Sequence, residues 1–355
     1  MRIATLADAA AIHTRRWVEH FRARGHTVRL WSLERGPAEL QVEALPVAPA
    51  PRFLRYPLAV PSLARALAAY APDLVDAHFV PNYGLMAVLA GRRPISVTAW
   101  GSDLLLAGRR GPLARARARY VLARADLVLA DAENLAAAAR ALGAPRDRVH
   151  VTPWGVDLAR FRPGAERESG LLVSLRVHEP IYDLPTLLLG AAPVLERRTG
   201  TRLVVVGDGS QRHALERLAA ERLPPGRVTF TGRLAPEALA ELLGRADLYL
   251  SASRSDSTSQ TLLEAMASGA VPVMSDLEAN REWVTDGEGA RFFRVGDVAG
   301  VTRALEAALA DPDWCARART RNRTVAEARA DWPRNLARIE TLFETLVGTR
   351  HAGVA

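Results

Sequence analysis

The chain has 355 residues, of which 49% are apolar and 24% charged, a composition that favours a soluble globular protein with room for two ordinary domains. Its single cysteine, Cys315, excludes an internal disulfide and a cysteine-based metal cage, and it fits a reducing cytoplasm. The net charge of +8 comes with 47 basic residues that are all arginine, so chemistry that needs a lysine is excluded. These arginines are spread along the chain without interleaved aromatic residues, and we therefore expect no nucleic-acid partner.

The first half of the chain alternates short apolar runs with helical patterns, which are clearest over residues 15–24 and 134–142. Strands are predicted near residues 3–6, 28–32, 74–77, 95–98, 127–130 and 149–152. Because strands that alternate with helices form parallel sheets covered on both faces, this half predicts a doubly wound α/β domain. The sequence contains no candidate signal peptide or transmembrane segment, so we expect a cytoplasmic protein.

A polar connection with proline and glycine, residues 159–168, leads into a second half with the same alternation. Further strands are predicted near residues 171–175, 203–206, 228–231, 248–251 and 271–274. We predict an N-terminal domain over residues 1–160 and a C-terminal domain over 165–330, with a cleft between them. The remaining pattern is helical, and a break at Trp332 either lets a last helix, at about 333–348, pack back on the first domain or is a plain cap.

Open parallel sheets bind ligands beyond the carboxyl ends of their strands, so the polar residues at those ends are the candidate site. In the first half these residues are His13, His78, Trp100, Gly101, Ser102 and Asp103. In the second half they are Arg176, Gly207, Asp208, Gly232, Arg233 and the polar stretch 253–259. We expect all of them to line one cleft if the two carboxyl edges face each other.

The stretch SRSDSTSQTLLEAMASG places small polar residues directly before an apolar helix. Ser257, Thr258 and Ser259 precede the first turn of that helix, where unsatisfied backbone N–H groups make an anion site. Glu264 lies among apolar neighbours and needs a partner if it is buried, and a pair of sugar hydroxyls would suit it. The alternative is that the polar residues only cap the helix and that Glu264 lies at the surface; this stretch alone favours neither.

Several segments, in a fixed order and spacing, carry a resemblance to a known family. They are GHTVRLWS (25–32), TAWGSD (98–103), TPWGVDLARFRP (152–163), LVVVGDGSQRHALERLA (203–219), VTFTGRLAPEALAELLGRADLYLSAS (228–253), LLEAMASGAVPVMSD (262–276) and EANREWVTDGEGARFF (278–293). Over nearly its whole length the chain resembles the retaining, GT-B-fold glycosyltransferases of family four, the glycosyl transferases of group 1.

The resemblance implies two Rossmann-like domains, with a UDP- or GDP-linked sugar bound mainly by the C-terminal domain and an acceptor bound mainly by the N-terminal domain. It implies transfer with retention at the anomeric carbon, with no metal and no cofactor besides the nucleotide-sugar substrate. Glu264 takes the place of the second glutamate of the family's Glu-x7-Glu motif, which implies hydrogen bonds to ribose, and Asp256 takes the first, facing the donor sugar. The donor would also lie beside Ser259, Gln260, Thr261 and residues 228–232.

The chain departs from the family pattern at the residues that would contact the diphosphate. The family places an arginine and, five residues on, a lysine there; Arg176 matches the arginine, but Ile181 takes the lysine position. Because a charge-assisted hydrogen bond is worth about 1.5–3 kcal/mol, this loss weakens phosphate binding unless another group compensates. The candidates for that compensation are His13, His178 and Tyr182.

The first domain also departs from the family pattern. Trp100 stands where a histidine is often found, and the segment AAAIHTRRW replaces the glycine-rich first loop. Because HTRRW combines a helix start with anion-binding groups, we predict a function for His13, whereas His78 either serves the site or simply ends a strand.

These positions together predict a glycosyltransferase with Arg176, Asp256 and His13 as its catalytic residues. The leaving diphosphate would help to deprotonate the acceptor hydroxyl, which belongs to a glycan, a lipid-linked or a small-molecule acceptor. Two alternatives are a GT-B-fold sugar-nucleotide epimerase and a non-catalytic sugar-nucleotide or glycan-binding partner of an active homologue.

Several arginines lie close together in one short segment, which suggests a peripheral contact with the inner face of a membrane. A solvated helix face is the stronger interpretation of this segment. The arginines of this segment are Arg109, Arg110, Arg115, Arg117 and Arg119.

Overall fold

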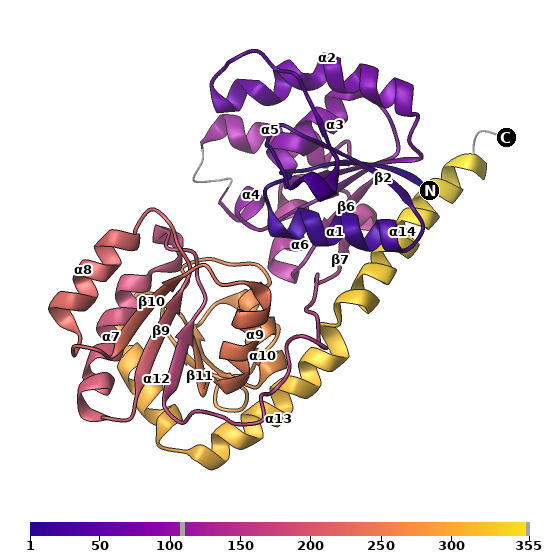
Figure 1. Ribbon diagram of the computed structural model, residues 1–355. Coiled ribbons are helices and arrows are strands. Elements are labelled where there is room, and N and C mark those ends of the chain that lie inside the picture. The colour runs from indigo at the N-terminus through magenta and orange to yellow at the C-terminus, as the bar shows by residue number, and fades with distance from the viewer. Residues whose placement is uncertain (107–110, 353–355) are drawn as a thin grey trace. The chain divides into compact units, whose positions relative to one another are not determined.

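The computed structural model describes residues 1–106 and 111–352, and the chain divides into two compact units. The first unit combines Met1–Pro153 with Pro333–Ala355, and the second unit is Trp154–Trp332 (Figure 1).

The junction of the two units lies at residues 153 and 154, so the polar connection at 159–168 belongs to the second unit. A β-bridge between Val156 and Asp331 joins the beginning of that unit to its end. Gly155 has a φ of +89°, and a Cβ at this position would lie 2.7 Å from the carbonyl oxygen of Ala330. Only glycine therefore lets these two segments pass each other so closely.

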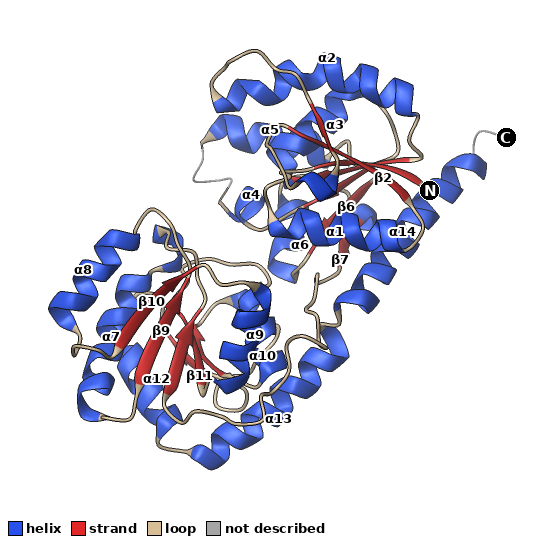
Figure 2. Ribbon diagram, viewed as in Figure 1, coloured by secondary structure: helices blue, strands red, loops and turns tan. Residues whose placement is uncertain are grey.

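A sheet of seven parallel strands forms the centre of the first unit, in the order β3-β2-β1-β4-β5-β6-β7 (Figure 2). Its strands are β1 (Arg2–Leu6), β2 (Thr27–Ser32), β3 (Val42–Ala44), β4 (Leu74–His78), β5 (Ile95–Thr98), β6 (Leu127–Ala130) and β7 (Val149–Val151). Every residue of β4, β5 and β6 is buried, because helices cover both faces at the centre of the sheet. All of these strands except the short edge strand β3 match the predicted ones.

Helices and short turns connect the strands of the first unit. They are α1 (Ile12–Ala23), the 3₁₀ turn η1 (Ala38–Leu40), α2 (Arg52–Tyr70), the π-helical turn η2 (Phe79–Gly84), α3 (Leu85–Ala90), α4 (Ser102–Leu105), α5 (Pro112–Leu122), α6 (Glu133–Ala141), the 3₁₀ turn η3 (Arg146–Arg148) and α14 (Trp332–Ala352). The predicted helices at 15–24 and 134–142 correspond to α1 and α6. No helix was predicted at α2, which contains Pro57 and Pro61 in its interior.

The last helix, α14, packs its apolar side on α1 within the first unit. Its fully buried residues are Leu336, Ile339 and Phe343. The ring of Phe343 stacks on Phe21 with the centroids 5.5 Å apart, and Glu340 accepts a hydrogen bond from His26 over 2.8 Å. The helix predicted at about 333–348 therefore lies on the first unit.

The second unit is built on a six-stranded parallel sheet in the order β10-β9-β8-β11-β12-β13. Its strands are β8 (Leu171–Ser174), β9 (Arg202–Val206), β10 (Val228–Gly232), β11 (Leu248–Ser251), β12 (Val271–Ser275) and β13 (Arg291–Phe293). The short edge strand β13 was not predicted, whereas the other five were.

The helices of the second unit form two layers, one on each face of its sheet (Figure 2). They are the 3₁₀ turn η4 (Pro180–Tyr182), α7 (Leu184–Arg197), α8 (Arg212–Arg222), α9 (Pro236–Arg245), α10 (Gln260–Ser268), α11 (Glu278–Arg281), α12 (Val298–Leu309) and α13 (Pro312–Arg329). Successive side chains of a strand point to opposite faces, so Leu248 and Leu250 pack with α7 and α12, whereas Tyr249 packs with α9 and α10. The two apolar cores hold β8 and β11 firmly, and these strands carry the candidate site at their carboxyl ends.

Candidate active site

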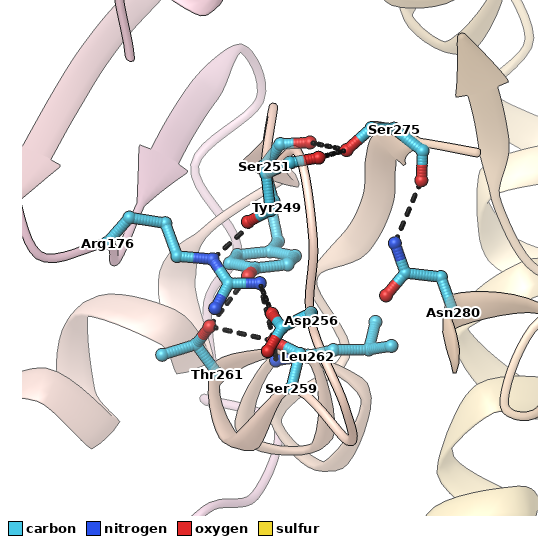
Figure 3. A network of polar contacts seen from close by, with 10 residues as sticks. Arg176, Tyr249, Ser251, Asp256, Ser259, Thr261, Leu262, Ser275 and Asn280 are labelled. Atoms are coloured by element: carbon cyan, nitrogen blue, oxygen red, sulfur yellow. Dashed lines mark hydrogen bonds and ion pairs between the residues drawn. The ribbon is translucent and has the colours of Figure 1, made fainter. Parts of the chain in front are cut away.

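Arg176 lies at the carboxyl end of the second sheet, two residues beyond β8. Strand β11 is the neighbour of β8 and ends at Ser251, so the two residues meet at the same edge of the sheet. The Nε of Arg176 donates a hydrogen bond to the Ser251 hydroxyl over 3.0 Å (Figure 3). The sheet thus holds Arg176 near its backbone and, through Ser251, at its Nε.

The guanidinium of Arg176 is buried and paired with a carboxylate. Its Nη2 lies 2.8 Å from Asp256 Oδ2 and 2.7 Å from the Ser259 hydroxyl, and only 6% of the residue is exposed. The ring of Tyr182 covers it, with the guanidinium carbon 5.2 Å from the ring centroid. Burial raises the pKa of Asp256, and the positive charge of Arg176 opposes that rise. A charged, desolvated pair therefore occupies the centre of the predicted donor site.

The polar stretch before α10 folds inward. Ser259 is the N-cap of α10, and its hydroxyl accepts a hydrogen bond from the backbone N–H of Leu262 over 3.2 Å. Ser257 and Thr258 are also buried, and Thr258 accepts a hydrogen bond from the indole of Trp283 over 3.3 Å. Capping is therefore one role of this stretch, and Ser259 combines it with a direct contact to Arg176.

Glu264 lies on α10 and is 5% exposed, which contradicts the alternative that it is a surface residue. The helix around it is anchored at its first turn. Gln260 donates a hydrogen bond to the carbonyl of Gly155 over 2.8 Å, and the Thr261 hydroxyl lies 2.7 Å from the hydroxyl of Tyr249. These two contacts anchor the helix that carries the buried carboxylate of Glu264.

Two glycines shape the neighbouring loops. Gly207 has a φ of +130°, and a Cβ there would lie 2.4 Å from the carbonyl oxygen of Arg176, so the loop after β9 needs glycine to pass this point. The N–H of Gly207 donates to the carbonyl of Gly232 over 2.9 Å, which ties the ends of β9 and β10 together. The remaining predicted residues of these loops, Asp208 and Arg233, lie at the same edge of the sheet, and Arg233 is exposed.

Sequence reasoning missed Arg254, which lies beside the position of the absent lysine. Its backbone N–H donates to the carbonyl of Ile181 over 2.8 Å, and its guanidinium lies 2.8 Å from Asp183 Oδ2. The Arg254 side chain is 51% exposed. Only its place in the polar stretch, two residues before Asp256, could have drawn attention to it.

In the first unit, His13, His78 and Trp100 meet around one cavity. The ring of Trp100 lies 5.0 Å from that of His13 and 5.4 Å from that of His78, measured between centroids. Burial, with smaller contributions from Arg16 and His78, lowers the pKa of His13 to about 4. His13 is therefore neutral near pH 7, and its predicted role in the site stays a prediction.

Asp103, which was predicted to lie on the acceptor side, is 1% exposed and does not line this cavity. Its two carboxylate oxygens accept hydrogen bonds from the backbone N–H groups of Val80 and Trp100, each over 3.0 Å. Burial raises its pKa to about 6. Asp103 thus joins the loops after β4 and β5. Of its predicted neighbours, Trp100 lines the cavity, whereas Gly101 and Ser102 do not.

No group of three or more His, Cys, Asp or Glu side chains in the described part of the chain is placed to hold a metal ion. No described helix has the length and apolar character to cross a membrane. Arg109 and Arg110 of the predicted basic segment lie outside the described residues, whereas Arg115, Arg117 and Arg119 lie on α5.

Two parallel-sheet units of this kind define the GT-B architecture, and solved structures share it. The sucrose-phosphate synthase from Thermosynechococcus elongatus superposes with a TM-score of 0.86 at 18% identity, covering 98% of this chain and 100% of that one. HepE from Anabaena, solved with UDP-glucose, gives a TM-score of 0.82 at 17% identity over the same shares. These likenesses confirm the predicted fold.

The sequence itself identifies the family. The model described as "Glycosyl transferases group 1" matches residues 163–330, and "Glycosyltransferase Family 4" matches residues 10–160. The chain belongs to this family of glycosyltransferases, which confirms the resemblance noted from the sequence.

Individual relatives match more narrowly. The D-inositol 3-phosphate glycosyltransferase of Nocardia farcinica is 36% identical over 48% of this chain and 42% of that protein. The GDP-mannose-dependent alpha-mannosyltransferase of Mycobacterium tuberculosis is 28% identical over 79% and 78%. The match covers 40% of the alpha-monoglucosyldiacylglycerol synthase of Streptococcus pneumoniae and 54% of the phosphatidyl-myo-inositol mannosyltransferase of Mycolicibacterium smegmatis. The chain thus spans about half the length of these two relatives and of the Nocardia protein.

Proposed function

We propose that the protein is a glycosyltransferase that moves a sugar from a UDP- or GDP-linked donor to a hydroxyl of a glycan, a lipid-linked or a small-molecule acceptor. Transfer proceeds with retention at the anomeric carbon and without a metal ion. The observation that carries this proposal is the buried guanidinium of Arg176, held at the N-terminus of α10 by Ser251, Asp256 and Ser259. A fixed cation beside a helix N-terminus is a site for the diphosphate of a leaving nucleotide.

In this proposal Nη1 of Arg176 contacts the diphosphate of the nucleotide sugar. The other two nitrogens, Nε and Nη2, already contact side chains of the protein. The first turn of α10 adds the backbone N–H groups of Gln260 and Thr261, which have no acceptor within the helix. Glu264 receives the ribose hydroxyls. Asp256 holds the guanidinium in place, and being one methylene shorter than glutamate it suits that short contact.

The reaction we propose conserves charge and atoms. The bond from the anomeric carbon to the diphosphate oxygen breaks, and its electron pair leaves with the diphosphate, which Arg176 and α10 stabilise. The acceptor oxygen forms the new bond on the same face, and its proton passes to an oxygen of the leaving diphosphate. The protein contributes mainly electrostatic stabilisation that is in place before the reaction starts.

Arg254 supplies the second positive charge that the family pattern places at Ile181. The two residues are joined by a backbone hydrogen bond, and the half-exposed Arg254 side chain is anchored to Asp183 at its base. In this proposal the guanidinium swings from Asp183 to the diphosphate when the donor binds.

The proposal includes both UDP- and GDP-linked donors, because the similar proteins include an example of each. HepE was solved with UDP-glucose, and the mannosyltransferase from Mycobacterium tuberculosis is named as dependent on GDP-mannose. Incubation with a panel of nucleotide sugars tests the proposal directly. Slow release of the nucleoside diphosphate supports it, whereas an altered sugar on an intact nucleotide indicates an epimerase, and binding without turnover indicates a non-catalytic partner.

We also propose that the protein works in the cytoplasm, with a peripheral contact to an anionic membrane through α5. This helix exposes Leu113 and Tyr120 beside Arg115 and Arg119, a combination that suits an interfacial helix. Flotation with phosphatidylglycerol vesicles, compared with phosphatidylcholine vesicles, tests this. Equal recovery with both vesicle types, or none with either, contradicts the contact.

A further inference from the structure

Another cavity lies in the second unit, at the edge of the sheet where the strands begin. Three of its lining residues directly precede strands: Gly170 comes before β8, Thr201 before β9 and Asp247 before β11. Strand β8 has four residues, so about 13 Å of strand separates this cavity from the opposite edge, where Arg176 lies. Its volume is about 410 Å³, within the roughly 300–1,000 Å³ of small-molecule sites. The cavity therefore has room for a ligand that does not touch the candidate active site.

Three arginines from different parts of the second unit line this cavity. Arg167 lies in the connection before β8, Arg198 directly follows α7, and Arg319 lies on α13. The guanidinium of Arg167 donates to the carbonyl of Ala246, and that of Arg319 donates to the carboxylate of Asp247. These two arginines are thus held beside each other by consecutive residues of one segment.

Each of the three guanidinium groups keeps donors that its protein contacts do not use. A guanidinium has five N–H donors, and that of Arg167 has one acceptor among the described residues, the carbonyl named above. Nε of Arg319 is buried, and no described residue accepts its hydrogen. Arg198 donates from Nε to Glu306 over 3.1 Å and from Nη1 to the last carbonyl of α12 over 3.4 Å, which leaves Nη2. Structural contacts therefore explain only part of this cluster.

The charges of the lining do not cancel. Among the described residues that form it, three are arginines and one, Asp247, is a carboxylate. Cys315 stays a neutral thiol near pH 7, because burial raises its pKa to about 11. Burial, and after it the charge of Arg319, lowers the pKa of Arg167. This direction is the one expected for cations that lack a compensating anion.

The surrounding charges leave this excess in place. Five arginines and four carboxylates lie close to the lining, several of them paired with one another: Arg197, Arg202, Arg227, Arg245, Arg291, Glu168, Glu306, Asp311 and Asp313. Helices α7 and α12 end beside the cavity and α13 begins there, so the charges of these helix ends sum to roughly half a negative charge. The two excess positive charges of the lining are larger than this contribution.

We propose that this cavity binds a small phosphate monoester, whose phosphate lies between the guanidinium groups of Arg167 and Arg319. A phosphate monoester carries about 1.5–2 negative charges near pH 7, which matches the excess, and its oxygens suit the planar fork of an arginine. The rest of the molecule has the hydroxyl of Thr201 and the apolar surface of Ala308 and Leu309 in the same lining. Free inorganic phosphate shares the charge but not the second part, so a monoester binds more tightly. This site is additional to the proposed transfer reaction and independent of it.

Calorimetry with the full chain tests the proposal. The probes are ribose 5-phosphate and glycerol 3-phosphate, compared with inorganic phosphate and with neutral ribose and glycerol. At least one monoester should bind at least threefold more tightly than inorganic phosphate, and the neutral compounds should not bind. Binding should persist in Arg176→Ala/Asp256→Ala, because the cavity lies at the other edge of the sheet. Loss of binding in that variant places the phosphate in the donor site and overturns the proposal, as does equal or tighter binding of inorganic phosphate.

A double substitution removes a cation of the cavity without leaving a buried charge unpaired. Arg319→Gln/Asp247→Asn should keep the fold, because the amide oxygen of asparagine can still accept from the N–H of Gly170. It should weaken binding of the monoester at least tenfold, as expected for a lost charged hydrogen bond. The control is Arg321→Gln on the same helix, whose side chain is 54% exposed and which should change nothing. Equal binding to the double variant and the parent, with the melting temperature preserved, overturns the proposal.

Asp247→Asn alone separates a ligand site from a structural ion pair. It removes the carboxylate that opposes the phosphate, so the monoester should bind at least threefold more tightly than to the parent. It should also be less stable without ligand, because Arg319 loses its partner. Ribose 5-phosphate or glycerol 3-phosphate should then raise the melting temperature of this variant more than that of the parent. Weaker binding to Asp247→Asn than to the parent contradicts the charge argument and with it the proposal.

Discussion

The two units use opposite electrostatics at the same place in the same kind of sheet. Beyond β8 and β11, a buried guanidinium is paired with a carboxylate and lies at a helix N-terminus. Beyond β4 and β5, the cavity is lined by the rings of His13, His78 and Trp100, and the buried carboxylate of Asp76 lies within hydrogen-bond distance of Trp17 and His78.

Under the proposed function, this difference matches what each half of a transfer reaction must hold. A leaving diphosphate develops negative charge, so a fixed cation stabilises the transition state more than the ground state. An acceptor hydroxyl stays uncharged until it reacts, so it needs orientation and a hydrogen-bond acceptor rather than a cation.

Arg176→Ala should lower turnover at least a hundredfold, because it removes the cation from the leaving group. It should also lower the melting temperature, since it leaves the carboxylate of Asp256 buried beside no cation. The double variant Arg176→Ala/Asp256→Ala should regain stability but not turnover. Arg176→Lys should recover only part of the activity, because the planar fork is lost. Near-normal turnover of the alanine variant, measured by nucleotide release, would show that this pair is merely structural.

Glu264→Gln should weaken donor binding by roughly tenfold or more, because a charged hydrogen bond contributes about 1.5–3 kcal/mol. The amide keeps the shape of the carboxylate, so the melting temperature should change little. Calorimetry with UDP and GDP, alongside a thermal melt, measures both quantities. Glu237→Gln is a suitable control, because Glu237 also lies on a helix of the second unit but is 74% exposed. Unchanged affinity would show that α10 does not bind the ribose.

Ser259→Ala should destabilise the second unit by about 0.5–2 kcal/mol, because it removes the N-cap of α10. It should also weaken diphosphate binding, since the same hydroxyl accepts from Arg176. Asp311→Ala removes the N-cap of α13, away from the site, and is the matched control for capping alone. If both variants lose stability and neither loses affinity, Ser259 is a cap and nothing more.

His13 should make stability fall on acidification. Its folded pKa of about 4 lies below the ordinary histidine value of 6.5, so the neutral form is favoured by the fold. The stabilising contribution is complete above pH 6.5 and is lost as the pH falls towards 4. Between pH 7 and 5 this amounts to at most about 2 kcal/mol. His13→Asn should flatten the pH dependence of chemical unfolding, and an unchanged slope would contradict burial of a neutral ring.

The parallel strands could be predicted because each central one is a short apolar run between helical patterns. The edge strands β3 and β13 have three residues each and are partly exposed, so no apolar run marks them. Helix α2 was not located from the sequence because it contains two internal prolines, and a proline normally interrupts a helix.

The candidate site was predictable where residues lie next to each other in a motif, as around Ser259 and Glu264. It was not predictable where the partners are distant in sequence. Trp17 and Asp76 are 59 residues apart, and their hydrogen bond exists only because α1 covers the face of β4 on which Asp76 lies. The neutral state of His13 is likewise a consequence of burial, which no short segment reveals.

The position of α14 has a consequence for biosynthesis. Phe343 packs on Phe21 and on Trp17, so the indole that holds Asp76 rests against the last helix of the chain. On the ribosome, however, about 180 residues of the second unit are made between Pro153 and Pro333. At roughly 5–20 residues per second the first unit waits on the order of 10–40 seconds for the helix that completes its apolar face. The unit that is translated first is therefore completed last, because Trp17 and Phe21 lack the cover of Phe343 until α14 has been made.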